Sequence, residues 1–151
     1  MTITIHTEPI FLEVRQKSHL GVQDIKDPEA RDNARAGLDK MDEITRCVYD
    51  AFGQLSRRCA RFLDRDYAVE ADNISRIPVA YAYEFRISER RAVNKAVALE
   101  EAMHGFVVQV ALARFCATVN QTERSNQHSL AALDYGNQID ELLYTKLPPR
   151  V

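Results

Sequence analysis

The sequence predicts one mostly α-helical domain of the α+β class, with a three-helix body that contains two long helices, a β-hairpin and an N-terminal strand. Apolar residues recur every three or four positions over two long stretches, 28–64 and 89–147, which is the spacing of amphipathic helices. Two shorter stretches alternate polar and apolar residues, as strands do. The 151 residues amount to one ordinary domain, and no linker divides them, so 1–151 is predicted to fold as a unit.

The N-terminal region is predicted to form a strand followed by a short helix. The alternation Thr2-Ile3-Thr4-Ile5-His6 indicates a half-buried strand, and residues 1–7 are a candidate extended arm. Pro9 suits the first turn of a helix, whose apolar side would hold Ile10, Phe11 and Val14. Residues 21–27 form a connection, because a glycine and a proline punctuate it.

Residues 28–64 are predicted to form a long amphipathic helix. Its continuous apolar stripe consists of Leu38, Met41, Ile44, Val48, Phe52, Leu55, Cys59 and Phe62 or Leu63. The first part, 29–37, is polar and alanine-rich, so it is either a separate turn or an exposed lead-in.

Residues 66–88 are predicted to form a β-hairpin, with turn residues at Asp72-Asn73 and a second strand that starts at Pro78. Tyr81, Tyr83, Phe85 and Ile87 recur at period two in that strand. We interpret this as the core side of the hairpin. The alternative is an aromatic platform for nucleic-acid bases, since arginines lie nearby.

Residues 89–147 are predicted to form a helical hairpin. Ser88 is a good N-cap and Glu89 suits the first turn of a helix that runs to about residue 119. Its core stripe is Ala92, Ala96, Leu99, Met103, Phe106, Val110 and Ala113. A polar break over 120–127 precedes a last helix over 129–146, which Leu147-Pro148-Pro149 ends. The inward residues of that helix are Ala132, Tyr135, Ile139, Leu142 and Leu143.

Composition and charge restrict the class of protein. The chain is 46% apolar and 28% charged, which is a globular profile, and its net charge of −2 implies neither a nucleic-acid nor a membrane partner. The three cysteines, Cys47, Cys59 and Cys116, lack C-x-x-C spacing and are predicted to be small buried hydrophobes in a reducing compartment. No signal peptide is recognisable, and the longest nearly apolar run, 105–119, is shorter than the roughly 20 residues that cross a bilayer, so we expect a soluble protein.

Residue clusters do not predict an enzyme, a cofactor or a metal. Glu101 and His104 have the Glu-x-x-His spacing of di-iron carboxylate bundles, but those proteins use it twice and it occurs once here. An exposed or interfacial pair is the simpler interpretation. The glycines are isolated, and no nucleophile-and-base motif is present.

Arginines gather between residues 57 and 91. Arg57, Arg61 and Arg65 would line one face of a helix, and with Arg86 and Arg90 they are candidates for phosphate contact. Acidic residues are interspersed among them, which favours a protein-contact or solvated surface.

Charge is also unevenly distributed along the chain. Residues 1–56 carry seven basic and ten acidic side chains, residues 57–95 carry nine and six, and residues 96–151 carry four and six. Such polarity suits head-to-tail packing of like subunits.

One set of segments resembles a known family. It comprises the strand Tyr81-Ala82-Tyr83-Glu84-Phe85-Arg86-Ile87-Ser88, the helix with Ala98-Leu99-Glu100-Glu101-Ala102-Met103-His104, the break Asn120-Gln121-Thr122-Glu123, and the end Leu142-Leu143-Tyr144-Thr145-Lys146-Leu147-Pro148-Pro149. In order and texture this is similar to the small head–tail connector (adaptor, or head-completion) proteins of tailed bacteriophages. The similarity is strongest over about 80–149 and weaker over 28–64, and it depends on no diagnostic motif.

The resemblance implies a virion structural protein made in the host cytoplasm. About a dozen copies would form a homo-oligomeric ring between portal and tail proteins, around the channel through which DNA passes. The hypothesis places subunit or portal contacts on the hairpin and the arm. The candidate interface residues are Ile3, Ile5, Arg57, Arg61, Arg65, Arg86 and Arg90. Deletion of residues 1–7 should then abolish assembly and leave the helices intact.

Three alternatives stay open. The chain is a tail terminator or another phage assembly protein, or a helical module that binds nucleic acid or protein, or, least favoured, a metal enzyme built on Glu101 and His104.

Overall fold

The computed structural model describes residues 1–70, 78–87 and 94–144, and it confirms the mostly α-helical α+β class. The turn at Asp72-Asn73, the cap at Ser88 and Glu89, Ala92, Arg90 and the end after Tyr144 lie outside the described residues. The described elements are β1 (Thr2–His6), α1 (Thr7–Gly21), α2 (Pro28–Ala34), α3 (Met41–Cys59), β2 (Leu63–Glu70), β3 (Pro78–Phe85), α5 (Ala96–Thr118) and α6 (Thr122–Leu143), with short 3-10 helices at Leu38–Lys40 and Ala60–Phe62.

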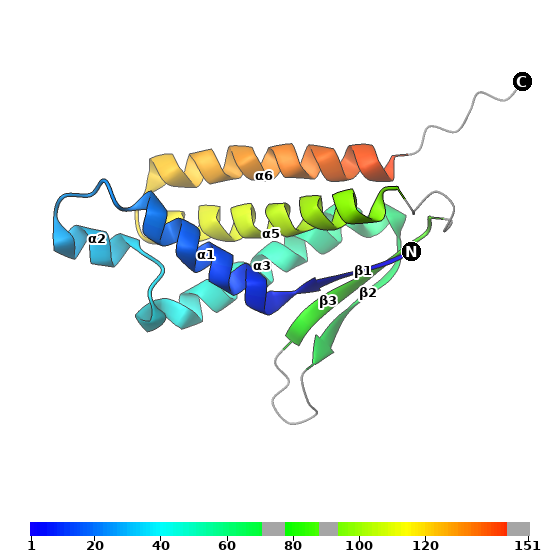
Figure 1. Cartoon of the computed structure of the whole chain (residues 1–151), viewed down its shortest axis with the longest axis horizontal. Coiled ribbons are helices and arrows are strands. Elements are labelled where there is room, and N and C mark those ends of the chain that lie inside the picture. The colour runs from blue at the N-terminus through cyan, green and yellow to red at the C-terminus, as the bar shows by residue number, and fades with distance from the viewer. Residues whose placement is uncertain (71–77, 88–93, 145–151) are drawn as a thin grey trace, which may run out of the picture.

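Helix α5 is the centre of the molecule. Helices α1, α3 and α6 all pack against it, and the three-stranded sheet lies beside its N-terminal part (Figure 1). Nearly every residue from Phe106 to Cys116 is buried. Helix α5 is also long and apolar enough to cross a membrane, but most of it is buried inside this fold.

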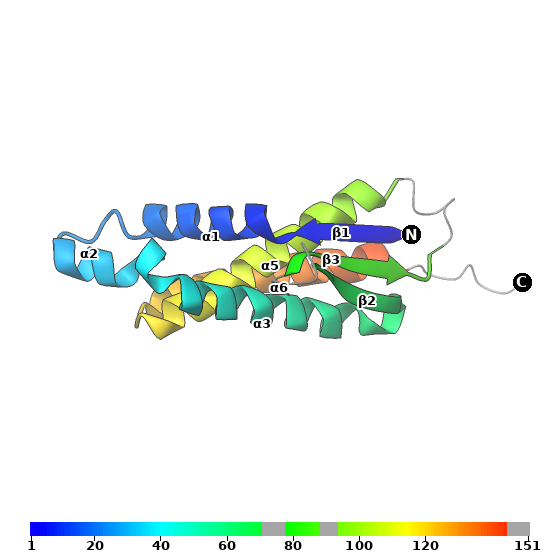
Figure 2. The same cartoon turned by 90° about the horizontal axis from the view of Figure 1, so that it is seen from below.

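The sheet has the order β1-β3-β2, and both pairings are antiparallel (Figure 2). Ile3 lies opposite Tyr83 and Ile5 opposite Tyr81. Tyr83 is fully buried, Phe85 is 3% exposed, and the ring of Tyr81 stacks on Phe52 of α3 with centroids 4.2 Å apart. The prediction that these aromatics form the core side of the hairpin is therefore confirmed, and the alternative of a platform for bases is wrong.

The N-terminal strand and helix are confirmed, although α1 is longer than predicted. Strand β1 passes into α1 without a loop, and the Thr7 hydroxyl at this junction lies 3.2 Å from the Pro78 carbonyl and 3.1 Å from that of Val79. Ile10 and Val14 are fully buried. The arm predicted over 1–7 is therefore part of the sheet of its own chain.

The single helix predicted over 28–64 is wrong, because the chain breaks after α2. Asp27 caps α2 by accepting a hydrogen bond from the Glu29 amide (3.1 Å), and Lys40 donates to the carbonyl oxygens of Asp32 (3.2 Å), Asn33 and Arg35 (3.0 Å). The Ala36 amide donates to the Ser18 hydroxyl of α1 (2.7 Å). These contacts satisfy the backbone groups that a continuous helix would have paired. The 29–37 segment is thus the separate element that its polar composition allowed.

Helix α3 ends at Cys59, and the chain enters β2 at Leu63. Its apolar stripe is confirmed from Ile44 to Cys59, since Ile44, Val48, Phe52, Leu55 and Cys59 are all buried.

The break between the last two helices is much shorter than the predicted 120–127. Asn120 adopts the left-handed conformation (φ 61°), the Gln121 amide donates to the Cys116 carbonyl (2.8 Å), and the Asn120 amide donates to that of Ala117 (3.3 Å). This is a Schellman end, after which α6 begins at Thr122. The first turns of α6 are polar because they face solvent, and Ser125 anchors them by donating to the Ala113 carbonyl (2.8 Å).

All three cysteines are free and buried, as predicted. Burial raises the pKa of the Cys59 thiol to about 12, which keeps it in the unreactive thiol form.

Candidate interaction surfaces along helix α6

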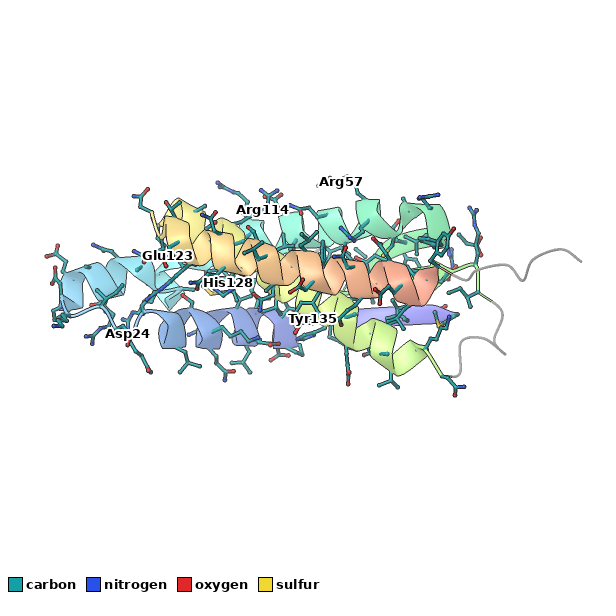
Figure 3. The ribbon with its side chains drawn as sticks, turned by 90° about the horizontal axis from the view of Figure 1, so that it is seen from above. Asp24, Arg57, Arg114, Glu123, His128 and Tyr135 are labelled. Carbon is teal, nitrogen blue, oxygen red and sulfur yellow. The ribbon has the colours of Figure 1, made fainter. Side chains whose placement is uncertain are left out.

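Helix α6 packs along α5, and each of its two sides borders a groove. Figure 3 shows Arg57 and Arg114 on one side of α6, and His128 and Tyr135 on the other. We name the first side the α3 flank, because α3 forms its far wall, and the second the α1 flank, because α1 contributes to it.

The groove of the α3 flank has a volume of about 430 Å³ and an apolar floor. Its lining residues come from three helices: Gln54 and Arg58 of α3; Phe106, Val110, Ala113, Arg114 and Ala117 of α5; and Ser125, Ser129, Ala132 and Leu133 of α6. Leu133 is 51% exposed, and the neighbouring Leu130 is 65% exposed. The groove therefore presents aliphatic surface beside guanidinium groups.

Arg58 of α3 forms an ion pair with α6 across this groove. Its guanidinium lies 2.9 Å from a carboxylate oxygen of Asp140 and 5.9 Å from the centre of the Phe106 ring. A Cβ atom at Gly136 would lie 2.5 Å from the Arg58 Cζ, so the missing side chain leaves room for the guanidinium. The Arg58 side chain is 26% exposed and that of Asp140 is 49% exposed, so the pair is partly screened by solvent.

Further arginines add positive charge on the side of the α3 flank. Arg114 pairs with Asp50 at 3.4 Å, whereas Arg57 and Arg61 are exposed and make no ion pair with any described residue. The two unpaired guanidinium groups stand in the last turn of α3 and in the 3-10 helix that follows it.

The α1 flank consists of two adjoining hollows, of about 430 Å³ and 620 Å³, that share Glu101 and Tyr135. The first is lined by Ile5, Glu13, Val97, Glu100, Glu101, His104, Gly105 and Tyr135. The second adds Ala98, Ala102, Gln138, Glu141 and Leu142. Four of these lining residues are glutamates, so this flank is acidic.

His104 pairs with Glu13 of α1. Its Nε2 lies 2.5 Å from a Glu13 carboxylate oxygen, and the Lys17 ammonium lies 3.1 Å from the other oxygen. Burial opposes ionisation of Glu13, but the hydrogen bonds from His104 and Lys17 outweigh it, so the pKa of this carboxyl is lowered. Among residues 1–70, 78–87 and 94–144, no three His, Cys, Asp or Glu side chains are arranged to hold a metal ion. The Glu101–His104 metal alternative thus finds no third ligand in the described part of the chain.

A second polar contact ties α5 to α6. Gln109 is 8% exposed, and the His128 Nδ1 lies 2.7 Å from its side-chain oxygen. Burial, together with the positive charges of Lys17 and Arg124, lowers the pKa of His128. His128 is therefore a neutral structural residue in the folded chain near neutral pH.

The predicted contact residues lie at different places. Ile3 (4% exposed) and Ile5 (2%) are core residues of their own chain, so their side chains are not surface groups. Arg57 and Arg61 are exposed, and Arg57 lies on the same side of α6 as Arg114 (Figure 3). Arg90 lies outside the described residues.

The predicted row of three arginines on one helix is wrong, because the helix ends before Arg65. That residue lies on β2, where its guanidinium contacts both carboxylate oxygens of Glu84 (2.7 and 2.9 Å) and stacks over Tyr67. Arg86, after β3, pairs with Asp64 at 2.8 Å. Both charges are balanced within the chain.

Sequence reasoning missed the residues that shape the two flanks. Leu130 and Leu133 carried a signal, since they are leucines on the polar side of the last predicted helix. The Glu13–His104 and Arg58–Asp140 pairs carried none, because each joins residues far apart in the chain. Comparison with protein-family models, curated proteins and solved structures finds no match to this chain.

Proposed function

We propose that this chain is a non-enzymatic structural protein of a tailed-phage virion, a head–tail connector or adaptor whose copies form a ring between portal and tail. The observation that carries the proposal is the pair of differently charged flanks on opposite sides of α6. A ring subunit touches its two neighbours through two different surfaces, so each copy needs two faces that complement each other.

The body of the chain suits such a role because it is rigid where the flanks lie. Helix α5 is buried along most of its length and supplies the floor of both grooves. Surfaces built on packed helices keep their shape in the free subunit, which lowers the entropic cost of assembly.

The sheet offers a separate surface for the portal or the tail. Met1 and Phe85 exchange main-chain hydrogen bonds (2.7 and 3.3 Å), so the main-chain groups of Thr2 and Thr4 point away from β3. Strand β1 is an edge strand with no charged side chain in its first four residues. An edge of this kind can accept a strand from another protein.

Two ion pairs weigh against the alternative of a nucleic-acid-binding module. Arg65 and Arg86, which that alternative uses, each contact a carboxylate of the same chain. A phosphate would have to displace those carboxylates.

The test uses the full chain and the portal protein of the phage or prophage that encodes it. We expect the chain to co-purify with portal rings and to form a ring of about a dozen copies on them when imaged by electron cryomicroscopy. Native mass spectrometry of the purified chain reads bound metal in parallel. Failure to bind the portal under all conditions, or stoichiometric iron or zinc in the chain, would overturn the proposal.

A further inference from the structure

We infer that copies of this chain associate head to tail, with the α3 flank of one copy docked on the α1 flank of the next. This inference rests on the proposed function in one respect: it assumes that several copies assemble. It adds the surface, the polarity and the residues of the contact.

Charge complementarity is the first argument. On the α1 flank, Glu100, Glu101 and Glu141 are exposed and make no ion pair with described residues. On the side of the α3 flank, Arg57 is exposed and equally unpaired within the described part of the chain (Figure 3). Opposite charges that stay uncompensated in the monomer lower their energy when two copies bring them together.

Apolar complementarity is the second argument. The α3 flank exposes Leu133, and Leu130 is exposed one turn earlier on the same helix. The α1 flank exposes Val97 (68%) beside the half-buried side chains of Tyr135 and Leu142. Exposed aliphatic side chains beside arginines on one flank, and apolar side chains beside glutamates on the other, have the composition of an interface core with a charged rim.

The geometry selects a second copy as the occupant. The two flanks lie on opposite sides of α6, so they cannot meet within one molecule (Figure 3). Each copy carries one of each, so contact between unlike flanks repeats from copy to copy and closes into a ring when the rotation allows. A contact between like flanks would instead oppose charges of the same sign.

The experiment is a charge exchange, read by sedimentation velocity at about 50 mM and about 500 mM salt. We expect the wild-type chain to self-associate at the lower salt and to dissociate at the higher. Arg57→Glu and Glu101→Arg should each weaken association by about tenfold or more, and the double exchange should restore it. Both side chains are exposed, and circular dichroism checks that the variants stay folded.

A pair of matched leucine variants tests the apolar part. Leu133 lies on the α3 flank, and Leu12, on α1, is exposed to a similar extent (54%) but lies outside both flanks. Leu133→Asp should abolish association, and Leu12→Asp should leave it unchanged.

The outcomes separate this inference from the proposed function. The head-to-tail contact alone is overturned if the chain binds the portal but stays monomeric at low salt. It is also overturned if the charge exchange at Arg57 and Glu101 leaves association unchanged. Charge-dependent association without portal binding supports the contact and overturns the connector role.

Discussion

Gly105 of α5 lies directly under the ring of Tyr135 in α6. A Cβ atom at Gly105 would come within 2.5 Å of Cε1 and Cζ of that ring, so the two helices approach closely at this point because the side chain is absent. Helices α5 and α6 are the most extensively packed pair of described elements, and Tyr135 lines both hollows of the α1 flank. The stability of the helical pair and the shape of the flank therefore depend on the same contact.

Gly105→Ala should destabilise the chain by about 1–3 kcal/mol, because the new methyl group overlaps an aromatic ring held between two helices. Urea unfolding followed by circular dichroism measures this. Gly53→Ala in α3 is the matched control, since the nearest atom to its Cβ is 3.9 Å away. That change should stabilise by about 0.5–1 kcal/mol through helix propensity. Equal effects of the two substitutions would contradict the close approach.

Gly136→Ala should behave differently, although its Cβ would lie as near to Arg58 as that of Gly105 does to Tyr135. The obstacle is the far end of a flexible side chain, which can swing into solvent. We expect a stability change below about 1 kcal/mol, with the Arg58–Asp140 pair lost and offset by the better helix propensity of alanine. A double-mutant cycle with Asp140→Asn reads this directly, because the Asp140 change should have no effect once Gly136→Ala is present. A loss as large as that of Gly105→Ala would show that Arg58 cannot move aside.

The turn between α5 and α6 gives another test at one residue. Asn120 has a φ of 61°, a conformation that asparagine and glycine adopt readily and β-branched residues do not. Asn120→Gly should be neutral or slightly stabilising, and Asn120→Val should cost about 1–2 kcal/mol. Thermal unfolding of both variants against Ala117→Val, an exposed position three residues earlier within α5, checks this. Equal melting temperatures for the glycine and valine variants would contradict the Schellman end.

Local periodicity allowed much of the fold to be predicted. The period-two aromatics of 81–87 and the apolar stripe of 44–59 are confirmed, because each set of residues lies on a face that packs against the core. The start of α6 was missed for a different reason. No residue of its first two turns is fully buried and most are polar, and a polar helix resembles a loop in sequence.

Features that depend on contacts between distant segments could not be predicted. The break after α2 depends on Ser18, which accepts the Ala36 amide, and on Lys40, which covers the end of α2. The place of Arg65 depends on where α3 stops, and thus on Leu63 entering the sheet. In the candidate site, Arg57 and Arg61 were identified from the sequence, but the apolar and acidic partners of the two flanks became apparent only from the packing of α6.

The N-terminal strand is now expected to be part of the folding core. Ile5→Ala should cost about 2–4 kcal/mol, because the side chain is 2% exposed and its removal leaves a cavity under the sheet. Thr2→Ala, at an exposed position of the same strand, should change stability by less than about 0.5 kcal/mol. Urea unfolding of the two variants makes the comparison. Deletion of residues 1–7 should therefore reduce stability as well as assembly. An Ile5→Ala variant as stable as the wild type would contradict this and would indicate that residues 1–7 form a free arm.

Acidification should weaken the fold first through His128. Its pKa is lowered in the folded chain from the ordinary 6.5, because burial and the nearby Lys17 and Arg124 disfavour the charged ring. The unfolded chain therefore binds the proton at a higher pH than the folded chain does, and stability is full above pH 6.5 and falls as the pH drops below it. His128→Asn keeps a side-chain N–H for Gln109 and cannot titrate, so the fall in the urea midpoint between about pH 7 and about pH 5.5 should shrink. Glu13 contributes at lower pH. Because its pKa is lowered in the folded chain, the stability that it gives is lost only as the pH falls below the ordinary pKa of 4.5. His6→Asn, at an exposed histidine of β1, is the control. If the urea midpoint of His128→Asn fell with pH as steeply as that of the wild type, the role of His128 in the pH dependence would be contradicted.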